Sequence, residues 1–194
     1  DGDLGIALSD TYTTDVFLQN FSRKHAKLFD GVRHDSGDPF KFVNKVINRY
    51  KELGIDPTTK TIIFSNALDF ELYREIAEYC GNRIRCAAGI GTNLTNDCGY
   101  KPSNIVMKLI RCRMNQRQPW FECIKLSDDE GKHMGSEREV SICKHECGIW
   151  LPLYDVLRKY PKALGELEPL MPNMVRTNLT VLLEEFYERN NWLW

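Results

Sequence analysis

One stretch decides how this chain is interpreted: Val32-Arg33-His34-Asp35-Ser36-Gly37-Asp38-Pro39. It lies between an apolar run at residues 31–32 and a helical pattern over residues 40–53, which places its charged groups at the end of a predicted strand. Asp38 followed by Pro39 is a favourable N-cap with proline at the first helical position. A turn with an arginine, two carboxylates, a hydroxyl and a glycine is suited to holding a polar ligand.

Short apolar runs alternate with helical patterns on both sides of this stretch. The apolar runs span residues 4–8, 31–32, 61–64 and 84–88, and the helical patterns span residues 14–29, 40–53 and 70–80. A strand and a helix in alternation, repeated at intervals of roughly thirty residues, are typical of βαβ units with a parallel sheet. We therefore expect an α/β fold.

Each predicted strand ends in a polar turn. These turns lie at residues 9–11, 33–38, 65–69 and 89–93. In parallel α/β folds the carboxyl ends of the strands meet at one edge, where ligands bind. The four turns therefore predict one shared site and favour a barrel segment over chance clusters of polar residues.

Two of these turns contain groups that suit a phosphorylated sugar. Arg33 beside Asp35 can bind an anionic group with its guanidinium fork while the acid accepts from hydroxyls; the alternative is a pair that only stabilises the turn. Gly89-Ile90-Gly91-Thr92 could expose backbone amides to a phosphate. This run lacks the third glycine of the dinucleotide fingerprint, so a plain turn is its alternative.

Asp10 and His34 are the remaining candidates at these strand ends. Asp10 either caps the helix that follows Thr13 or orients a histidine in a shared cleft. His34 is expected to point away from its neighbours, because adjacent side chains of an extended chain alternate. No Ser/His/Asp triad and no P-loop spacing is visible in the sequence.

The composition excludes several classes of function. The 194 residues carry 26 basic and 27 acidic side chains, a net charge of −1, and no basic block, which argues against nucleic-acid binding. No apolar run approaches the roughly 20 residues that cross a bilayer, so no membrane association is expected. Seven cysteines at irregular spacing suit a reducing, cytoplasmic compartment. Cys143 and Cys147 with His145 invite a zinc interpretation, which we do not favour because no second pair has ligand spacing.

The pattern changes after residue 100. Residues 104–112 and 120–126 predict a hairpin-like pair, residues 127–132 a turn, and residues 137–147 a short helix. Prolines then divide the chain, and residues 175–187 predict an amphipathic helix. We expect two parts, residues 1–148 and a helical tail over residues 149–194. A start at Asp1 that leads directly into an apolar run suggests a portion of a longer protein.

Five ordered blocks resemble the C-terminal half of the nicotinate phosphoribosyltransferase family. They are Leu4-Gly5-Ile6-Ala7-Leu8-Ser9-Asp10-Thr11-Tyr12-Thr13-Thr14-Asp15, Gly31-Val32-Arg33-His34-Asp35-Ser36-Gly37-Asp38-Pro39, Gly89-Ile90-Gly91-Thr92-Asn93-Leu94-Thr95-Asn96-Asp97, Asn104-Ile105-Val106-Met107-Lys108-Leu109 and Lys125-Leu126-Ser127-Asp128. The resemblance covers about residues 1–148. Nicotinamide phosphoribosyltransferases are similar at a greater distance.

This resemblance implies an irregular TIM-like α/β barrel of the type II phosphoribosyltransferase kind. It implies that nicotinate and phosphoribosyl pyrophosphate are converted to nicotinate mononucleotide and pyrophosphate in NAD biosynthesis. ATP hydrolysis would be coupled through a phosphorylated histidine, with Mg²⁺ accompanying the phosphates. That histidine and an aromatic residue that stacks on nicotinate would precede Asp1, so this chain alone is not expected to turn over.

The resemblance also implies roles for individual residues. Asp10 would hold the histidine, Arg33 would meet the nicotinate carboxylate or the sugar phosphate, and Asp35 would accept from ribose hydroxyls. The predicted substrate and phosphate-binding residues are Ser36, Gly37, Asp38, Ser65, Asn66, Gly89, Gly91 and Thr92, and no metal ligand is predicted.

Asn66 departs from the family pattern, because family members usually carry an acid there. Two alternatives stay open: a nicotinamide or quinolinate phosphoribosyltransferase, and a non-catalytic nucleotide-binding or assembly module. A homodimer is one assembly state that the sequence leaves open.

Overall fold

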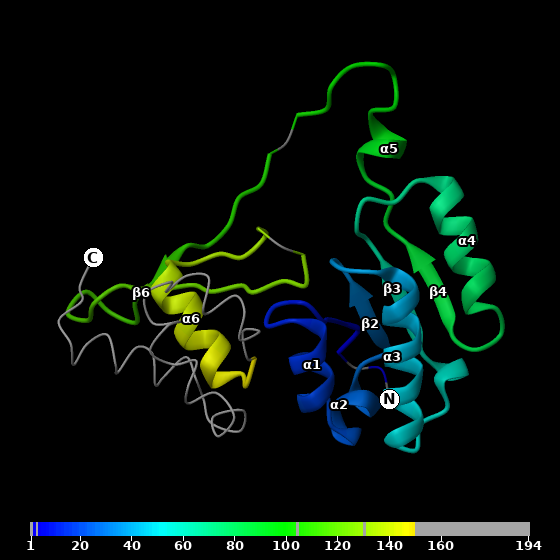
Figure 1. The fold of residues 1–194 in the computed structure, drawn as a ribbon, viewed down its shortest axis with the longest axis horizontal. Coiled ribbons are helices and arrows are strands. Elements are labelled where there is room, and N and C mark those ends of the chain that lie inside the picture. Colours follow the sequence, from blue (N-terminus) through cyan, green and yellow to red (C-terminus); the bar gives the residue numbers. More distant parts are fainter. Residues whose placement is uncertain (1, 3, 104, 130, 150–194) are drawn as a thin grey trace, which may run out of the picture. The chain divides into compact units, whose positions relative to one another are not determined.

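The sheet of the protein is parallel and follows chain order (Figure 1). The computed structural model describes residues 2, 4–103, 105–129 and 131–149. The strands are β1 (Ile6–Leu8), β2 (Gly31–His34), β3 (Thr61–Phe64) and β4 (Arg85–Ala88), paired in the order β1-β2-β3-β4. The parallel α/β architecture is thereby confirmed. The closed barrel stays a prediction, because these four strands form an open sheet.

The helices begin at capping residues that the sequence indicates. They are α1 (Thr14–Asn20), α2 (Arg23–Leu28), α3 (Pro39–Glu52), the 3₁₀ turn η1 (Pro57–Thr59), α4 (Phe70–Cys80), α5 (Thr92–Thr95) and α6 (Glu137–Glu146). The side chains of Thr13, Asp38 and Asp69 accept hydrogen bonds from the first turns of α1, α3 and α4. The cap predicted at Asp38 is therefore confirmed, and the turns after β1, β2 and β3 are fixed at their helical ends.

The prediction of a single helix over residues 14–29 is wrong. The segment forms two helices, because Ser22 caps α2 by accepting from the His25 amide. Phe21, between the helices, is buried and lies edge-on to Tyr50 of α3. Apolar periodicity continues through this break and does not reveal it, since Phe21 packs into the core from outside a helix.

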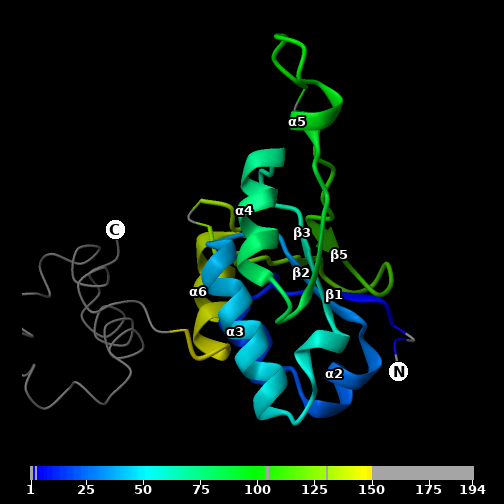
Figure 2. The same ribbon diagram turned by 90° about the vertical axis from the view of Figure 1, so that its right-hand side faces the viewer.

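The hydrophobic core lies on one face of the sheet. Val32, Ile62 and Phe64 are fully buried there against α3 and α4, and Figure 2 shows both helices along that face. Side chains alternate along a strand, so Arg33 lies on the opposite face and is exposed. The packing of β2 thus presents the guanidinium away from the core.

Gly31 sets how closely β2 approaches β3. A Cβ added at this residue would lie 1.8 Å from the carbonyl oxygen of Thr61, a backbone atom that a rotamer change cannot move. Only glycine therefore fits at this position in the observed register, in which Gly31 pairs with Thr61.

The later part of the chain holds a small hairpin. Strands β5 (Arg111–Cys112) and β6 (Phe121–Glu122) pair antiparallel, which confirms the predicted pair but with much shorter strands.

The chain divides after Cys143 into two units. The predicted helix over residues 175–187 and the tail from residue 150 lie outside the described residues. Among the described residues, no helix combines the length and apolarity needed to cross a membrane.

Candidate functional site

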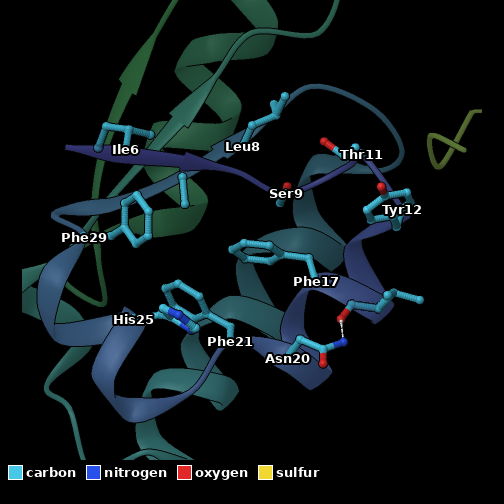
Figure 3. A pocket seen from close by; sticks show the side chains of 12 residues that line it. Ile6, Leu8, Ser9, Thr11, Tyr12, Phe17, Asn20, Phe21, His25 and Phe29 are labelled. Atoms are coloured by element: carbon cyan, nitrogen blue, oxygen red, sulfur yellow. Dashed lines mark hydrogen bonds between the residues drawn. The ribbon is translucent and has the colours of Figure 1, made fainter. Parts of the chain in front are cut away.

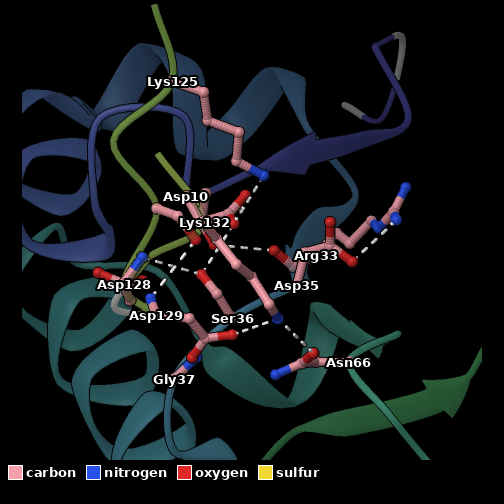
Figure 4. A network of polar contacts seen from close by, with 12 residues as sticks. Asp10, Arg33, Asp35, Ser36, Gly37, Asn66, Lys125, Asp128, Asp129 and Lys132 are labelled. Atoms are coloured by element: carbon pink, nitrogen blue, oxygen red, sulfur yellow. Dashed lines mark hydrogen bonds and ion pairs between the residues drawn. The ribbon is translucent and has the colours of Figure 1, made fainter. Parts of the chain in front are cut away.

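The carboxyl ends of the four parallel strands lie at one edge of the sheet, as the sequence predicts. The residues that follow β1, β2 and β3 converge there (Figure 4). This edge, called the rim below, comprises residues 9–14, 33–38, 65–69 and 89–93 together with residues 125–129, 131 and 132.

Arg33, Asp35 and Ser65 form one polar cluster of the rim. The Arg33 Nη2 donates to Asp35 Oδ1 at 3.0 Å, and its Nε donates to the Ser65 hydroxyl at 2.8 Å. Ser65 Oγ in turn lies 2.8 Å from the same Asp35 oxygen. The Arg33 side chain is 46% exposed and that of Asp35 27%. The cluster is held in place from two strands yet is open to a ligand.

Asp10 is buried and tied to two other residues of the rim. Its Oδ2 accepts from the Ser36 hydroxyl at 2.8 Å and pairs with the Lys125 ammonium at 2.9 Å. Its Oδ1 is buried without a hydrogen-bond partner among the described residues. The interpretation of Asp10 as a helix cap is wrong, because Thr13 caps α1. Asp10 instead joins the turn after β1 to Ser36 and Lys125 through its Oδ2.

The segment over residues 125–132 closes the rim from a distant part of the sequence. Asp128 accepts from the Thr14 amide at 2.9 Å and from the Thr14 hydroxyl at 2.5 Å, and its own amide donates to Ser36 Oγ at 3.1 Å. Asp129 accepts from the Gly37 amide at 2.8 Å. Gly37 has a φ of +79°, a conformation that glycine adopts without strain. The turn after β2 is therefore shaped by contacts with this segment.

Lys132 adds a cation to the rim. Its ammonium contacts Asp129 and donates to Asn66 Oδ1 at 3.3 Å, and its side chain is 54% exposed. The hydrogen bond from Lys132, followed by that from the Gly37 amide, holds the pKa of Asp129 below its usual value. Asn66 thus lies beside the Lys132 ammonium, whose charge is balanced by the Asp129 carboxylate.

His34 points into the core, as alternation predicts. Its ring lies near the rings of Phe42 and Phe64, with centroids 4.9 and 5.6 Å away. Its Nε2 lies 3.1 Å from the Gly37 carbonyl, to which it can only donate, and its buried Nδ1 has no partner in the described part of the chain. Burial lowers the pKa of His34. The ring supports the turn from below and does not face the rim opening.

The predicted phosphate-binding residues after β4 lie at the same sheet edge but outside the hydrogen-bonded network. The Gly89 amide donates to the Phe64 carbonyl at 2.8 Å, so this N–H belongs to the sheet. Gly91 and Thr92 begin α5 and are exposed. Asn93 Nδ2 donates to the Leu68 carbonyl at 2.8 Å and anchors α5 to the turn after β3. Asp38 caps α3 with one carboxylate oxygen.

Strained backbone is concentrated at the rim. In the described part of the chain, the residues other than glycine with positive φ are Thr13 (80°), Ala67 (49°) and Ser127 (62°). Each costs about 1–3 kcal/mol and persists where surrounding contacts enforce it, as at ligand sites. Thr13 follows β1, Ala67 follows β3, and Ser127 lies in the segment over residues 125–132.

A metal centre is not evident within residues 2, 4–103, 105–129 and 131–149. No group of three or more His, Cys, Asp or Glu side chains in these ranges is arranged to hold an ion. Of the two cysteines considered above for zinc, Cys143 lies in α6 and Cys147 directly follows the last residue of that helix.

Sequence reasoning missed the roles of Lys125, Asp128, Asp129 and Lys132. Lys125 lies in the predicted hairpin and the other three in the turn after it, so none of them follows a predicted strand of the parallel sheet. The many charged residues over residues 125–132 could have indicated a binding role, but an ordinary surface turn has the same composition.

Comparison with known proteins gives a consistent result. The sequence profile of the "Nicotinate phosphoribosyltransferase (NAPRTase) family" matches residues 1–148. A nicotinate phosphoribosyltransferase of Desulforapulum autotrophicum is 56% identical over 142 residues, which are 73% of this chain and 36% of that protein. One of Chromohalobacter salexigens is 51% identical over 143 residues, which are 74% and 36% of the two chains.

Solved structures agree with these sequence matches. The crystal structure of nicotinate phosphoribosyltransferase from Porphyromonas gingivalis superposes with a TM-score of 0.73 at 53% identity, covering 77% of this chain and 39% of that one. The chain therefore spans little more than a third of the length of these relatives.

Proposed function

Because this chain belongs to the nicotinate phosphoribosyltransferase family, we propose that it supplies part of the site at which such an enzyme joins nicotinate to phosphoribosyl pyrophosphate. The products would be nicotinate mononucleotide, a precursor in NAD biosynthesis, and pyrophosphate. The observation that carries the proposal is the cluster of Arg33, Asp35 and Ser65, open to solvent beside the Asp10 network.

The chemistry of these side chains suits the reaction. The pyridine nitrogen attacks the anomeric carbon while the bond from that carbon to pyrophosphate breaks, and the carbon becomes positively charged as the bond lengthens. A carboxylate fixed beside the ring stabilises this charge without reorganising. Asp35, held by Arg33 and Ser65, is preorganised for that role and for accepting from ribose hydroxyls.

Arg33 would bind the nicotinate carboxylate or the sugar phosphate. Two of its nitrogens are engaged by Ser65 and Asp35, which fixes the plane of the guanidinium, and the side chain is 46% exposed, so its remaining donors are available to a ligand. Ser36 is buried between Asp10 and Asp128, so it would act by positioning Asp10. The buried Oδ1 of Asp10 is the acceptor that would hold a histidine ring.

Further elements of the proposal rest on the family resemblance alone. These are coupling to ATP hydrolysis, a requirement for Mg²⁺, closure of the sheet into a barrel, a cytoplasmic location and assembly as a homodimer. When bound, Mg²⁺ would neutralise phosphate charge, and no step above depends on it. Phosphate contacts of Gly91 and Thr92, and a separate tail from residue 149, have the same status.

The test uses this chain together with the remainder of the Desulforapulum autotrophicum relative, produced as a second polypeptide. Calorimetry with phosphoribosyl pyrophosphate measures binding, and an assay for nicotinate mononucleotide measures turnover. We expect both from the combined polypeptides. Binding without product would instead favour a non-catalytic nucleotide-binding module.

Variants of the open cluster test the residue assignments. Arg33→Ala and Asp35→Ala are each expected to lower kcat/KM by roughly 100-fold or more, since each removes a charged contact to the transition state. Glu78→Ala, an exposed acid on α4, serves as the control. Near-normal activity of either rim variant would refute its assignment.

A further inference from the structure

Two cysteines lie on the same face of the β5–β6 hairpin. Cys112 of β5 pairs with Phe121 of β6, and the Cys123 amide donates to the Ile110 carbonyl at 2.9 Å. Residues directly opposite each other in an antiparallel pair share a face, and so do residues two apart in one strand. Cys112 and Cys123 are therefore diagonal neighbours on one face of the hairpin.

The two thiols meet across this hairpin. Burial, and next a hydrogen bond with the Cys112 thiol, raise the pKa of Cys123. Both cysteines are free, Cys112 exposed and Cys123 half-buried. A disulfide between them needs a sulfur–sulfur distance of about 2.05 Å. Each strand has two residues, and the described residues place no third strand beside them, so the hairpin can adjust to that length.

The other face of the hairpin holds the two strands together and carries positive charge. Arg111 pairs with Glu122 at 3.7 Å, and the Arg113 guanidinium lies 4.5 Å from the centre of the Trp120 ring. These contacts align the strands, so the thiols are brought together before any bond forms between them. The two arginines flank Cys112 in the sequence, and their charge attracts an anionic oxidant such as glutathione disulfide.

A second pair of thiols provides a comparison. Cys80 of α4 hydrogen-bonds with Cys86 of β4, but Cys80 is fully buried, and burial raises its pKa to about 12. A buried thiol that stays protonated neither meets an oxidant nor attacks it. We therefore expect Cys80 and Cys86 to stay reduced under conditions that oxidise the hairpin.

We propose that Cys112 and Cys123 form a reversible disulfide with glutathione disulfide as the oxidant. The thiolate of Cys112, the more exposed cysteine, attacks one sulfur of glutathione disulfide, whose S–S bond breaks and releases a first glutathione. The Cys123 thiolate then attacks the Cys112 sulfur of the mixed disulfide and releases a second glutathione. The two protein thiols lose two electrons and two protons, which end on the two glutathiones. The proposal does not depend on the proposed reaction.

The disulfide would act on the segment that closes the rim. Two residues after Cys123, Lys125 pairs with the buried Asp10, and the Leu126 amide donates to the Thr11 carbonyl at 2.8 Å. Figure 3 shows Thr11 in the turn that follows β1. A covalent bond across the hairpin limits the movement of the strand from which this segment starts. Oxidation should therefore slow hydrogen exchange at the Cys123 and Lys125 amides.

Equilibration of this chain in glutathione buffers tests the proposal. At a fixed ratio of oxidised to reduced glutathione, diluting the buffer tenfold should raise the ratio of bridged to reduced protein about tenfold, because the bridge releases two glutathiones for each glutathione disulfide consumed. A mixed disulfide releases only one, so its amount should not respond to dilution. Trypsin digestion without a reductant should give residues 118–125 joined to residues 112–113.

Cysteine variants complete the test. Cys112→Ser and Cys123→Ser should each abolish the response to dilution, whereas Cys98→Ser, which removes another exposed thiol, should leave it unchanged. Hydrogen exchange of β2 and β3 verifies that the bridged chain is folded. Mixed disulfides alone, a bridge to another cysteine or between two copies of the chain, or a bridge that forms only after β2 and β3 lose protection would overturn the proposal.

Discussion

At the scale of single residues, the rim combines a buried carboxylate that is paired with a lysine and cationic side chains that are exposed to solvent. Asp10 is buried and pairs with Lys125, whose side chain is 26% exposed, whereas Arg33 and Lys132 remain about half exposed. The pair of Asp10 and Lys125 therefore shapes the rim, and the exposed cations are the groups that a phosphorylated ligand would meet first.

The charge around Lys132 can be tested with variants. Asn66 carries no charge, so Asp129 is the carboxylate that the described residues place against the Lys132 ammonium. We predict that Lys132→Gln weakens the affinity for phosphoribosyl pyrophosphate by roughly tenfold, the effect of one charged hydrogen bond. Asn66→Asp should weaken it in the same direction, because a second carboxylate neutralises the cation.

Calorimetry at two salt concentrations checks this prediction, since an electrostatic effect diminishes with added salt. Asn66→Ala is the control that removes the amide without adding charge. An Asn66→Asp variant that binds more tightly would show that the position holds a hydroxyl or an ion and does not tune Lys132.

His34 predicts a pH dependence of stability. Burial lowers its pKa below the usual 6.5, so the unfolded chain takes up a proton on this residue before the folded chain does. The stabilisation is complete above pH 6.5 and is lost as the pH falls from there towards the folded pKa. We expect the Tm to fall between pH 7 and pH 5.

Two measurements check this dependence. The NMR titration of the His34 ring should give a midpoint below the usual 6.5, and His34→Gln should flatten the Tm profile in this range. Asp129 and Glu122, the carboxylates whose pKa is lowered, titrate at lower pH. They therefore do not contribute to the change in Tm between pH 7 and pH 5. A midpoint for His34 at or above 6.5 would contradict the prediction.

At the scale of secondary structure, the caps were predictable and the break between α1 and α2 was not. Asp38 and Pro39 are neighbours in sequence, so their signal is local and complete. The end of α1 depends on Phe21 reaching Tyr50, a contact 29 residues away that no local pattern contains. Strand ends were predictable for the same local reason. The segment over residues 125–132 was not, because its partners Gly37 and Thr14 lie 92 and 114 residues earlier.

The cap of α3 gives a prediction that separates structure from binding. Asp38→Ala should lower the free energy of unfolding by about 1 kcal/mol, because the amides of Phe40 and Lys41 lose their acceptor. Asp38→Asn retains an accepting oxygen and should restore most of that stability. Urea unfolding measures both. An Asn variant that is stable but binds phosphoribosyl pyrophosphate poorly would show that the second carboxylate oxygen contacts the ligand.

At the scale of the whole first unit, residues 125–132 act as a strap that joins the turns after β1 and β2. Asp128 carries most of this connection, since it accepts from both the amide and the hydroxyl of the buried Thr14. The strap also fixes Lys132 and the Gly37 amide, because Asp129 contacts both. Loss of the strap should therefore loosen the rim without unfolding the core.

Asp128→Ala is expected to lower stability by about 2–3 kcal/mol, the range for charge-assisted hydrogen bonds to buried groups. Hydrogen exchange should accelerate in residues 125–134 and at Gly37, while Val32 and Ile62 remain protected because the core on the other face of the sheet is unchanged. Asp128→Asn, which keeps one acceptor, should show an intermediate effect. Equal acceleration across β2 and β3 would mean that the strap and the core unfold as one unit, and that the rim cannot open by itself.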